Sequence, residues 1–267
     1  MTSSPPKANK NLQVLNSHHA RTIRILAEYL EPKSRLDHQA IFDTIVFFGS
    51  ARFPDAATAK KMAAEASTEQ EQRLAEIAGS GSRYYEDARN LAAMLTKWAS
   101  ETALEGRRFV VCSGGGPGIM EAANRGAYEA GGPSIGFNIT LPQEQQPNPY
   151  ITPDLSFQFH YFFMRKLWFA YLAKVLIVFP GGFGTLDELM EILTLTQTRK
   201  IRKKVLVLIY GREYWDKVLN FDAMIEMGTI DESDRKLFTY ADTPDEAFAI
   251  LTPWLAEHYS DRSERLP

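Results

Sequence analysis

The sequence is poor in several features, and each scarcity excludes a class of protein. Its 267 residues include a single cysteine, Cys112, which excludes an intrachain disulfide and a multi-cysteine metal site and favours a cytoplasmic location. Thirty Lys and Arg nearly balance 33 Asp and Glu, for a net charge of −3, which argues against a nucleic-acid or anionic-membrane binder. The most apolar stretch, 157–179, carries Arg165, Lys166 and Lys174, so we predict a buried core segment there and no membrane span.

Short apolar runs alternate with helical periods, which is the pattern of an α/β fold. The runs are 43–50, 109–113, 134–138, 175–179 and 204–210, and the main helical periods are 84–105, 119–130, 163–173 and 186–198. Continuous apolar runs are typical of parallel strands covered on both faces. We therefore predict a Rossmann-like doubly wound parallel sheet with helices on both faces, whose ligands bind beyond the carboxyl ends of the strands.

The chain shows no internal repeat and no convincing linker, so we predict a single nucleotide-binding domain over residues 1–267. Residues 56–82 are rich in Ala, Glu, Lys and Gln and end in Gly-Ser-Gly-Ser. We interpret them as a helical surface insertion with a flexible exit. We expect residues 1–15 and 258–267 to fray, and the first segment has no apolar region of the kind found in secretory signals.

Seven of the 17 glycines lie in two turns, each between an apolar run and a helical period. Such turns let the backbone approach a ligand, and the N–H groups that open the next helix attract anions. Each turn is therefore a candidate phosphate site, the alternative being a purely structural turn. Neither fits the dinucleotide or P-loop signatures. The candidate substrate contacts are Gly114, Gly115 and Gly116 in the first turn and Gly181, Gly182, Gly184 and Thr185 in the second.

Four charged residues near the second turn are candidates for chemistry. Asp187 and Glu188 lie early in the helix after the turn, where the helix dipole favours carboxylates by about 0.3–1 kcal/mol. This explains Asp187, but a carboxylate beside a bound phosphate is repelled, so we give Glu188 a role as general base or cation-stabilising group. Arg165 and Lys166 begin a helix within an aromatic stretch. We predict that both face one rim and bind an anion, the alternative being a solvated pair.

Other polar residues give weaker signals. Ser50 follows the first apolar run and would either donate to a ligand or cap a turn, and Glu144 would either reach a ribose hydroxyl or remain a solvated loop carboxylate. Cys112 has no basic neighbour in the sequence, which is typical of an inert buried thiol. The five histidines lack metal-ligand spacing, so we predict no metal. Eight aromatic residues in 157–171 are assigned to the core or to a dimer interface.

The run from Pro180 to Glu188, P-G-G-F-G-T-L-D-E, lies downstream of the Arg165-Lys166 pair. It meets every fixed position of the pattern P-G-G-x-G-T-x-x-E, and on this basis the chain resembles the lonely guy family of nucleoside 5′-monophosphate phosphoribohydrolases, often labelled lysine decarboxylase-like. The resemblance extends from Phe47 to about Gln197 and is closest to the long bacterial branch.

This resemblance implies an N-glycosidic hydrolase that needs no cofactor and forms a homodimer or a larger assembly of dimers. Its substrates would be AMP-like or cytokinin riboside monophosphates, cleaved to a free base and ribose 5-phosphate. The family's catalytic residues fall on Arg165 and Glu188. Lys166 and the second glycine turn fall on substrate-binding positions, and Glu144 aligns with a further acidic contact. The alternatives are a ribosyl-transfer enzyme and a non-catalytic carrier of a nucleotide or phosphorylated cofactor.

Overall fold

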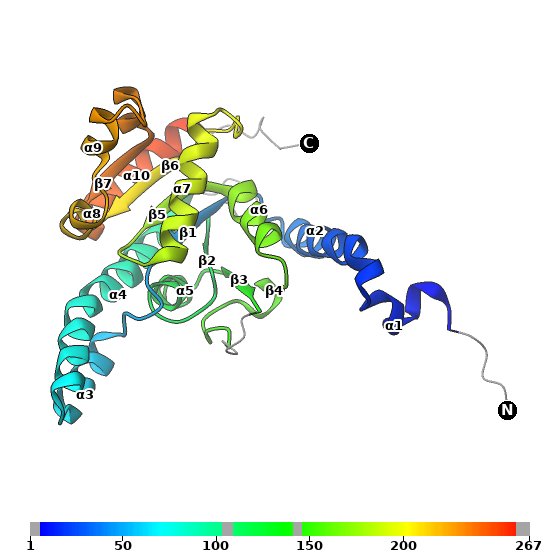
Figure 1. The fold of residues 1–267 in the computed structure, drawn as a ribbon, viewed down its shortest axis with the longest axis horizontal. Coiled ribbons are helices and arrows are strands. Elements are labelled where there is room, and N and C mark those ends of the chain that lie inside the picture. The colour runs from blue at the N-terminus through cyan, green and yellow to red at the C-terminus, as the bar shows by residue number, and fades with distance from the viewer. Residues whose placement is uncertain (1–5, 103–108, 141–145, 260–267) are drawn as a thin grey trace.

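The computed structural model describes residues 6–102, 109–140 and 146–259. Its centre is a seven-stranded sheet of order β4-β3-β2-β1-β5-β6-β7, in which every pairing is parallel (Figure 1). The strands are β1 (Thr44–Phe48), β2 (Val110–Ser113), β3 (Ser134–Ile139), β4 (Ser156–Phe159), β5 (Ala173–Val178), β6 (Leu206–Tyr210) and β7 (Phe238–Ala241). The predicted Rossmann-like parallel fold is confirmed.

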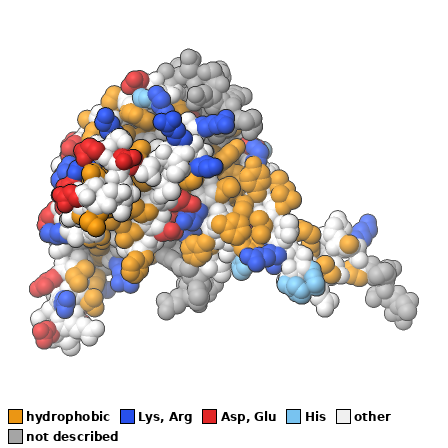
Figure 2. Space-filling view, turned by 45° about the horizontal axis from the view of Figure 1, so that its top comes forward, with side chains coloured by type: hydrophobic (Ala, Val, Ile, Leu, Met, Phe, Trp, Pro, Cys, Tyr) orange, Lys and Arg blue, Asp and Glu red, His pale blue; other side chains and the backbone are white. Residues whose placement is uncertain are grey.

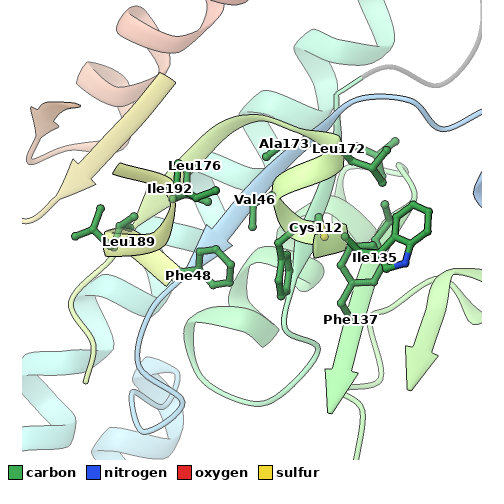
Figure 3. Packing of buried hydrophobic residues seen from close by; sticks show 14 of the residues in the cluster. Val46, Phe48, Cys112, Ile135, Phe137, Leu172, Ala173, Leu176, Leu189 and Ile192 are labelled. Carbon is green, nitrogen blue, oxygen red and sulfur yellow. The ribbon is translucent and has the colours of Figure 1, made fainter. Parts of the chain in front are cut away.

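Consecutive residues of a strand point to opposite faces of the sheet, and helices cover both faces. On β1, Ile45 and Phe47 belong to one apolar core, whereas Val46 and Phe48 belong to the other. The first core is covered by α4 (Glu69–Thr102), α5 (Ile119–Glu129) and α10 (Pro244–Tyr259), and the second by α2 (Arg21–His38), α6 (Phe162–Leu172), α7 (Phe183–Gln197), α8 (Arg212–Val218) and α9 (Phe221–Glu226). Figure 3 shows part of the second core around Val46, Phe48 and Phe137.

The strand order reverses between β1 and β5, and this point positions the candidate site. The chain adds β2, β3 and β4 on one side of β1, then returns to place β5 on its other side and continues outward to β6 and β7. The last residues of β1 and β5, Phe48 and Val178, are register partners. The carboxyl ends of these two strands therefore flank a crevice of the kind in which doubly wound sheets bind ligands.

The stretch 56–82 is helical, but its predicted flexible exit is wrong. Helix α3 (Ala56–Glu65) is followed by α4, and Gly79–Ser82 lie inside α4 without interrupting it. A Cβ on Gly81 would lie 2.3 Å from the ring of Phe53. Gly81 thus permits a close helix-to-loop contact, and the Gly-Ser composition does not indicate flexibility because packing overrides helix propensity here.

Several elements at the two ends of the chain were not anticipated. Helix α2, which follows the short α1 (Leu12–Leu15), extends from one side of the molecule, while the α3–α4 pair extends from the other (Figure 1). Strand β7 was also missed. His258 and Tyr259 complete α10, and Tyr259 is buried, so these two residues are not frayed; residues 1–5 and 260–267, on which the rest of the predicted fraying falls, lie outside the described part. No helix within the described ranges is both long and apolar enough to cross a bilayer.

Candidate active site

A cavity of about 660 Å³ opens beyond the carboxyl ends of β1 and β5. Its walls come from the segment after β1, from the first glycine turn, and from the second glycine turn with the start of α7. The lining residues include Ser50, Arg52, Phe53, Gly114, Met120, Asn138, Phe162, Arg165, Gly181, Gly182, Phe183, Gly184, Thr185, Asp187, Glu188 and Tyr214. The structure therefore brings most of the residues predicted from the sequence to one cavity.

The second glycine turn forms one wall of the cavity, and its glycines differ in the space around them. A Cβ on Gly181 would lie 2.1 Å from Oγ1 of Thr185, so only glycine fits there. Gly182 and Gly184 face open space. Gly182 occupies the N-cap of α7, and no side chain caps this helix end. Because the first N–H groups of a helix have no partner inside it, this wall presents several backbone donors and the positive end of a helix dipole to the cavity.

The first glycine turn contributes less surface than predicted. Gly114 lines the cavity, but Gly115 and Gly116 are absent from its lining. The Asn148 amide donates to the carbonyl oxygens of both at 3.1 Å and to Oδ1 of Asn124 at 2.9 Å. Gly115 has φ +75°, a conformation that glycine adopts without strain. Gly115 and Gly116 thus support the site from behind.

Ser50 connects the two turns. Its backbone N–H donates to the carbonyl of Pro180 at 2.9 Å, and its own carbonyl accepts from the N–H of Ile119, the first residue of α5, at 3.0 Å. Its hydroxyl oxygen accepts from the N–H of Arg52 at 3.1 Å. Ser50 therefore has a structural role, and since its hydroxyl donates to no other described residue, the hydroxyl proton is available to a ligand in the adjoining cavity.

Glu188 is a buried carboxyl facing the cavity, 7% exposed. Within the described residues, no cation lies within 4 Å of it and no hydrogen bond to it is present. Burial raises the pKa of Glu188 to about 7, although the positive charges of Arg165 and Lys166 oppose the rise. Glu188 can therefore take up or release a proton near neutral pH, as a general acid or base must.

Arg165 lies on another wall of the same cavity, in the first turns of α6. Its Nε donates to the carbonyl of Phe137 at 2.8 Å, and its guanidinium lies over the ring of Phe169 at 5.3 Å. Burial lowers the pKa of Arg165, and the negative charge of Glu188 opposes this. A Cβ on Gly114 would lie 2.4 Å from Nη2 of Arg165, so the glycine turn makes room for the guanidinium. Arg165 retains donors for an anion or a leaving group.

Lys166 is not in the lining of the cavity that holds Arg165, but it contacts Asp187, which is; its binding of an anion stays a prediction. Its Nζ pairs with Asp187 at 3.0 Å and with Glu191 at 3.3 Å. It lines an adjacent groove instead of the cavity that holds Arg165. The helical rotation of about 100° per residue separates adjacent side chains and explains this division. Asp187 is at a helix position that the dipole favours, and it also holds Lys166 beside the site.

Two further residues from the sequence analysis remain, Glu144 and Cys112. Glu144 lies outside the described residues. Cys112 is fully buried, and burial raises its pKa, but Arg165 lies near enough to oppose the rise; the absence of a basic neighbour in sequence was therefore misleading.

The sequence did not indicate three residues at or behind the site, which are Asn138, Asn148 and Tyr214. The Tyr214 hydroxyl donates to the Gly181 carbonyl at 2.7 Å, a contact that no local pattern could reveal. Among the described residues no group of three or more His, Cys, Asp or Glu could hold a metal ion.

Residues 120–251 match the family described as "Possible lysine decarboxylase". A probable cytokinin riboside 5′-monophosphate phosphoribohydrolase of Oryza sativa subsp. japonica is 30% identical over 146 residues, 54% of this chain and 62% of that protein. A cytokinin riboside 5′-monophosphate phosphoribohydrolase of the same plant is 30% identical over 152 residues, 56% and 61% of the two chains. The match thus spans about three fifths of the length of these curated relatives.

Solved structures with a similar outline include a molybdenum cofactor binding protein from Rippkaea orientalis and a Moco carrier protein from Chlamydomonas reinhardtii. The first has a TM-score of 0.46 and 17% identity, over 80% of this chain and 97% of that one. The second has a TM-score of 0.47 and 19% identity, over 80% and 98%. At these scores the likeness carries no functional argument.

Proposed function

With its resemblance to the lonely guy family confirmed by the matching family and relatives, we propose that this chain hydrolyses the N-glycosidic bond of AMP-like nucleoside 5′-monophosphates. The observation that carries the proposal is Glu188, a buried carboxyl with a pKa of about 7, in one cavity with Arg165 and an uncapped helix N-terminus. A phosphate site alone has no use for such a carboxyl. Glycosidic cleavage uses one directly.

The 5′-phosphate would bind at the start of α7. The backbone N–H groups of Phe183, Gly184 and Thr185 would donate to its oxygens, helped by the helix dipole. Gly182 and Gly184 have open space where a Cβ would stand, which leaves room for the phosphate to approach. The hydroxyl of Ser50 offers a further donor. Binding energy spent on the phosphate would orient the ribose, whose C1′ must approach the reacting groups.

At C1′ the carboxylate of Glu188 would act on a water molecule or on the developing positive charge. The water oxygen forms a bond to C1′, the bond from C1′ to the base nitrogen breaks, and the two water protons end on the sugar hydroxyl and the departing base. Glu188 accepts a proton as the water attacks and is then able to return it, because its pKa is near 7. The products are a free base and ribose 5-phosphate.

Arg165 and Lys166 would support this step in different ways. The guanidinium of Arg165, fixed by the Phe137 carbonyl, would hold the substrate or donate to the departing base. Lys166 would not contact the substrate and would act on it only through its charge, from outside the cavity wall. Its present contacts with Asp187 and Glu191 keep those two carboxylates from repelling a phosphate. We retain Glu144 as a proposed acidic contact on the basis of resemblance alone.

The deciding experiment is to incubate the protein with AMP, GMP, CMP and UMP and to measure released base. We expect release from AMP and full activity in the presence of a chelator. Glu188→Gln should reduce turnover by about 10²- to 10⁴-fold with nucleotide binding largely retained. Glu76→Gln, an exposed carboxylate on α4, is the control and should change nothing.

The other outcomes identify the alternatives. Appearance of a new nucleotide when a second base is added would indicate ribosyl transfer in place of hydrolysis. Failure to release base from any of the four nucleotides would favour a carrier of a nucleotide or phosphorylated cofactor.

We also propose a homodimer. Phe162, Phe163 and Leu167 on α6 are 52%, 49% and 40% exposed, and Figure 2 shows hydrophobic side chains gathered between the body of the protein and the projecting α2. An exposed patch of large apolar side chains is typical of an interface. Light scattering on the purified protein, compared with Phe163→Glu and Leu167→Glu together, tests this: a monomeric wild type would refute it. The cytoplasmic location stays a prediction from the single cysteine.

A further inference from the structure

Arg52 stands at the rim of the candidate active site with an unused charge. It lines the cavity and is exposed. Its backbone N–H donates to the Ser50 hydroxyl. Among the described residues, no carboxylate lies within 4 Å of its guanidinium and no hydrogen bond from it is present. Arg165 and Lys166, by contrast, are both held by other protein groups.

The backbone around Arg52 is fixed on both sides. Before it, Ser50 is hydrogen bonded to Pro180 and Ile119. After it, the N–H of Ala56 donates to the Glu86 carboxylate of α4 at 3.2 Å. A solvated surface arginine would need no such support. Here the segment leads from β1 to α3 and is hydrogen bonded at each end, to the second glycine turn through Pro180 and to α4 through Glu86.

Between these two ends, Phe53 is packed against α4. Its ring stacks on Tyr84 with centroids 5.9 Å apart. It lies so close to Gly81 that a Cβ there would be 2.3 Å from Cδ1 of Phe53. Because Gly81 has no side chain, it leaves a notch in the surface of α4, and the ring of Phe53 fills this notch. Phe53 is next to Arg52 in the sequence, so α4 directly contacts the segment at the rim of the cavity.

We propose that Arg52 binds the 5′-phosphate of the substrate and that Phe53, seated at Gly81, is the residue that positions it. The inference rests on the proposed phosphate site at the second glycine turn. Two observations place Arg52 on the phosphate side: the backbone nitrogen of the nearby Ser50 lies 3.1 Å from where a Gly181 Cβ would stand, and the other cavity arginine, Arg165, is held on the β3 side by the Phe137 carbonyl. Arginine suits this role because its fork of N–H groups matches phosphate oxygens.

The first test compares ligands with and without the phosphate. Binding of AMP and of adenosine is measured by calorimetry in the Glu188→Gln background, where turnover is suppressed. Adding Arg52→Gln should weaken AMP binding by about tenfold, the value of one charge-assisted hydrogen bond, and leave adenosine binding unchanged. Arg52→Lys should restore part of the loss. Arg73→Gln, an exposed arginine on the α3–α4 extension outside the cavity, is the matched control.

The second test addresses positioning. Gly81→Ala should displace Phe53 and weaken AMP binding in the same way as Arg52→Gln, with adenosine binding unchanged. Once Arg52 is Gln, Gly81→Ala should have no further effect, because both substitutions act through one side chain. Gly79→Ala on the same helix, with nothing within 4 Å of its Cβ, is the control and should not alter AMP binding.

The outcomes separate this inference from the proposed hydrolysis. An unchanged preference for AMP over adenosine in Arg52→Gln would overturn the inference even if base release is observed. Loss of that preference would support it even if no nucleotide is hydrolysed. Additive effects of Gly81→Ala and Arg52→Gln would overturn the positioning role of Phe53. Failure of the unaltered chain to bind AMP would overturn the inference and the proposed function together.

Discussion

Replacing Glu188 by Gln should stabilise the protein, and more so as the pH rises. The carboxyl lies buried in the cavity wall, and burial raises its pKa from 4.5 to about 7. In the unfolded chain the same group ionises near 4.5. Between these values the folded state holds a proton that the unfolded state has released, so the free energy of unfolding falls as the pH rises. Gln has the same shape and no charge, and avoids this loss.

The magnitude follows from the two pKa values. At about 1.36 kcal/mol for each pKa unit, a rise from 4.5 to about 7 corresponds to about 3 kcal/mol once the pH exceeds 7. At pH 5.5 only about 1.4 kcal/mol is lost. The advantage of Glu188→Gln over the wild type should therefore grow by about 2 kcal/mol between pH 5.5 and pH 8. For a chain of this size that is a gain in melting temperature of about 4–8 °C.

Urea denaturation of the two proteins at pH 5.5, 6.5, 7.5 and 8.5 measures this difference. Glu76→Gln, which removes an exposed carboxylate from α4, controls for the change in net charge. A difference between wild type and Glu188→Gln that stays constant over this pH range would refute the reasoning, since it would mean that Glu188 ionises alike in the folded and unfolded states. Loss of activity with this gain in stability would be the signature of a residue retained for chemistry.

Two of the three further predictions concern the same site and its support, and the third concerns the amino ends of β1 and β5 at the opposite edge of the sheet. Arg165→Met removes a positive charge that opposes the rise in the pKa of Glu188, so the pH at which kcat reaches half its maximum, expected near 7 for the wild type, should move upward; a downward movement in the pH–rate profile would contradict this. Asn148→Ala removes the side-chain donor to the Gly115 and Gly116 carbonyls, while the backbone N–H of residue 148 still donates to Gly115; the change should cost about 1–3 kcal/mol in urea unfolding, and a loss below about 0.5 kcal/mol would show that the side-chain bonds do not support the turn. Lys174→Met breaks the buried 3.3 Å pair with Asp43 and should cost about 3–5 kcal/mol, whereas the double change with Asp43→Leu should recover much of it.

The sequence by itself determined the sheet and the chemistry-bearing turns. Parallel strands buried on both faces must be apolar throughout, so the runs that became β1, β2, β3, β5 and β6 were visible without any tertiary information. Glycines directly after a strand indicate a tight turn or a close backbone approach, and this too can be recognised from the local sequence. Edge strand β7 was missed because three of its four residues are only partly buried, so it lacks that continuous apolar pattern.

The direction and environment of each side chain were decided only by the tertiary structure. Arg165 and Lys166 are neighbours in sequence, yet helical rotation and the packing of α6 against α7 send them to different partners. The pKa of Glu188 depends on which elements exclude water around it. The Gly81 notch depends on Phe53, 28 positions away. Burial and contacts between distant segments are properties of the assembled chain, so local patterns named the participating residues but not their roles.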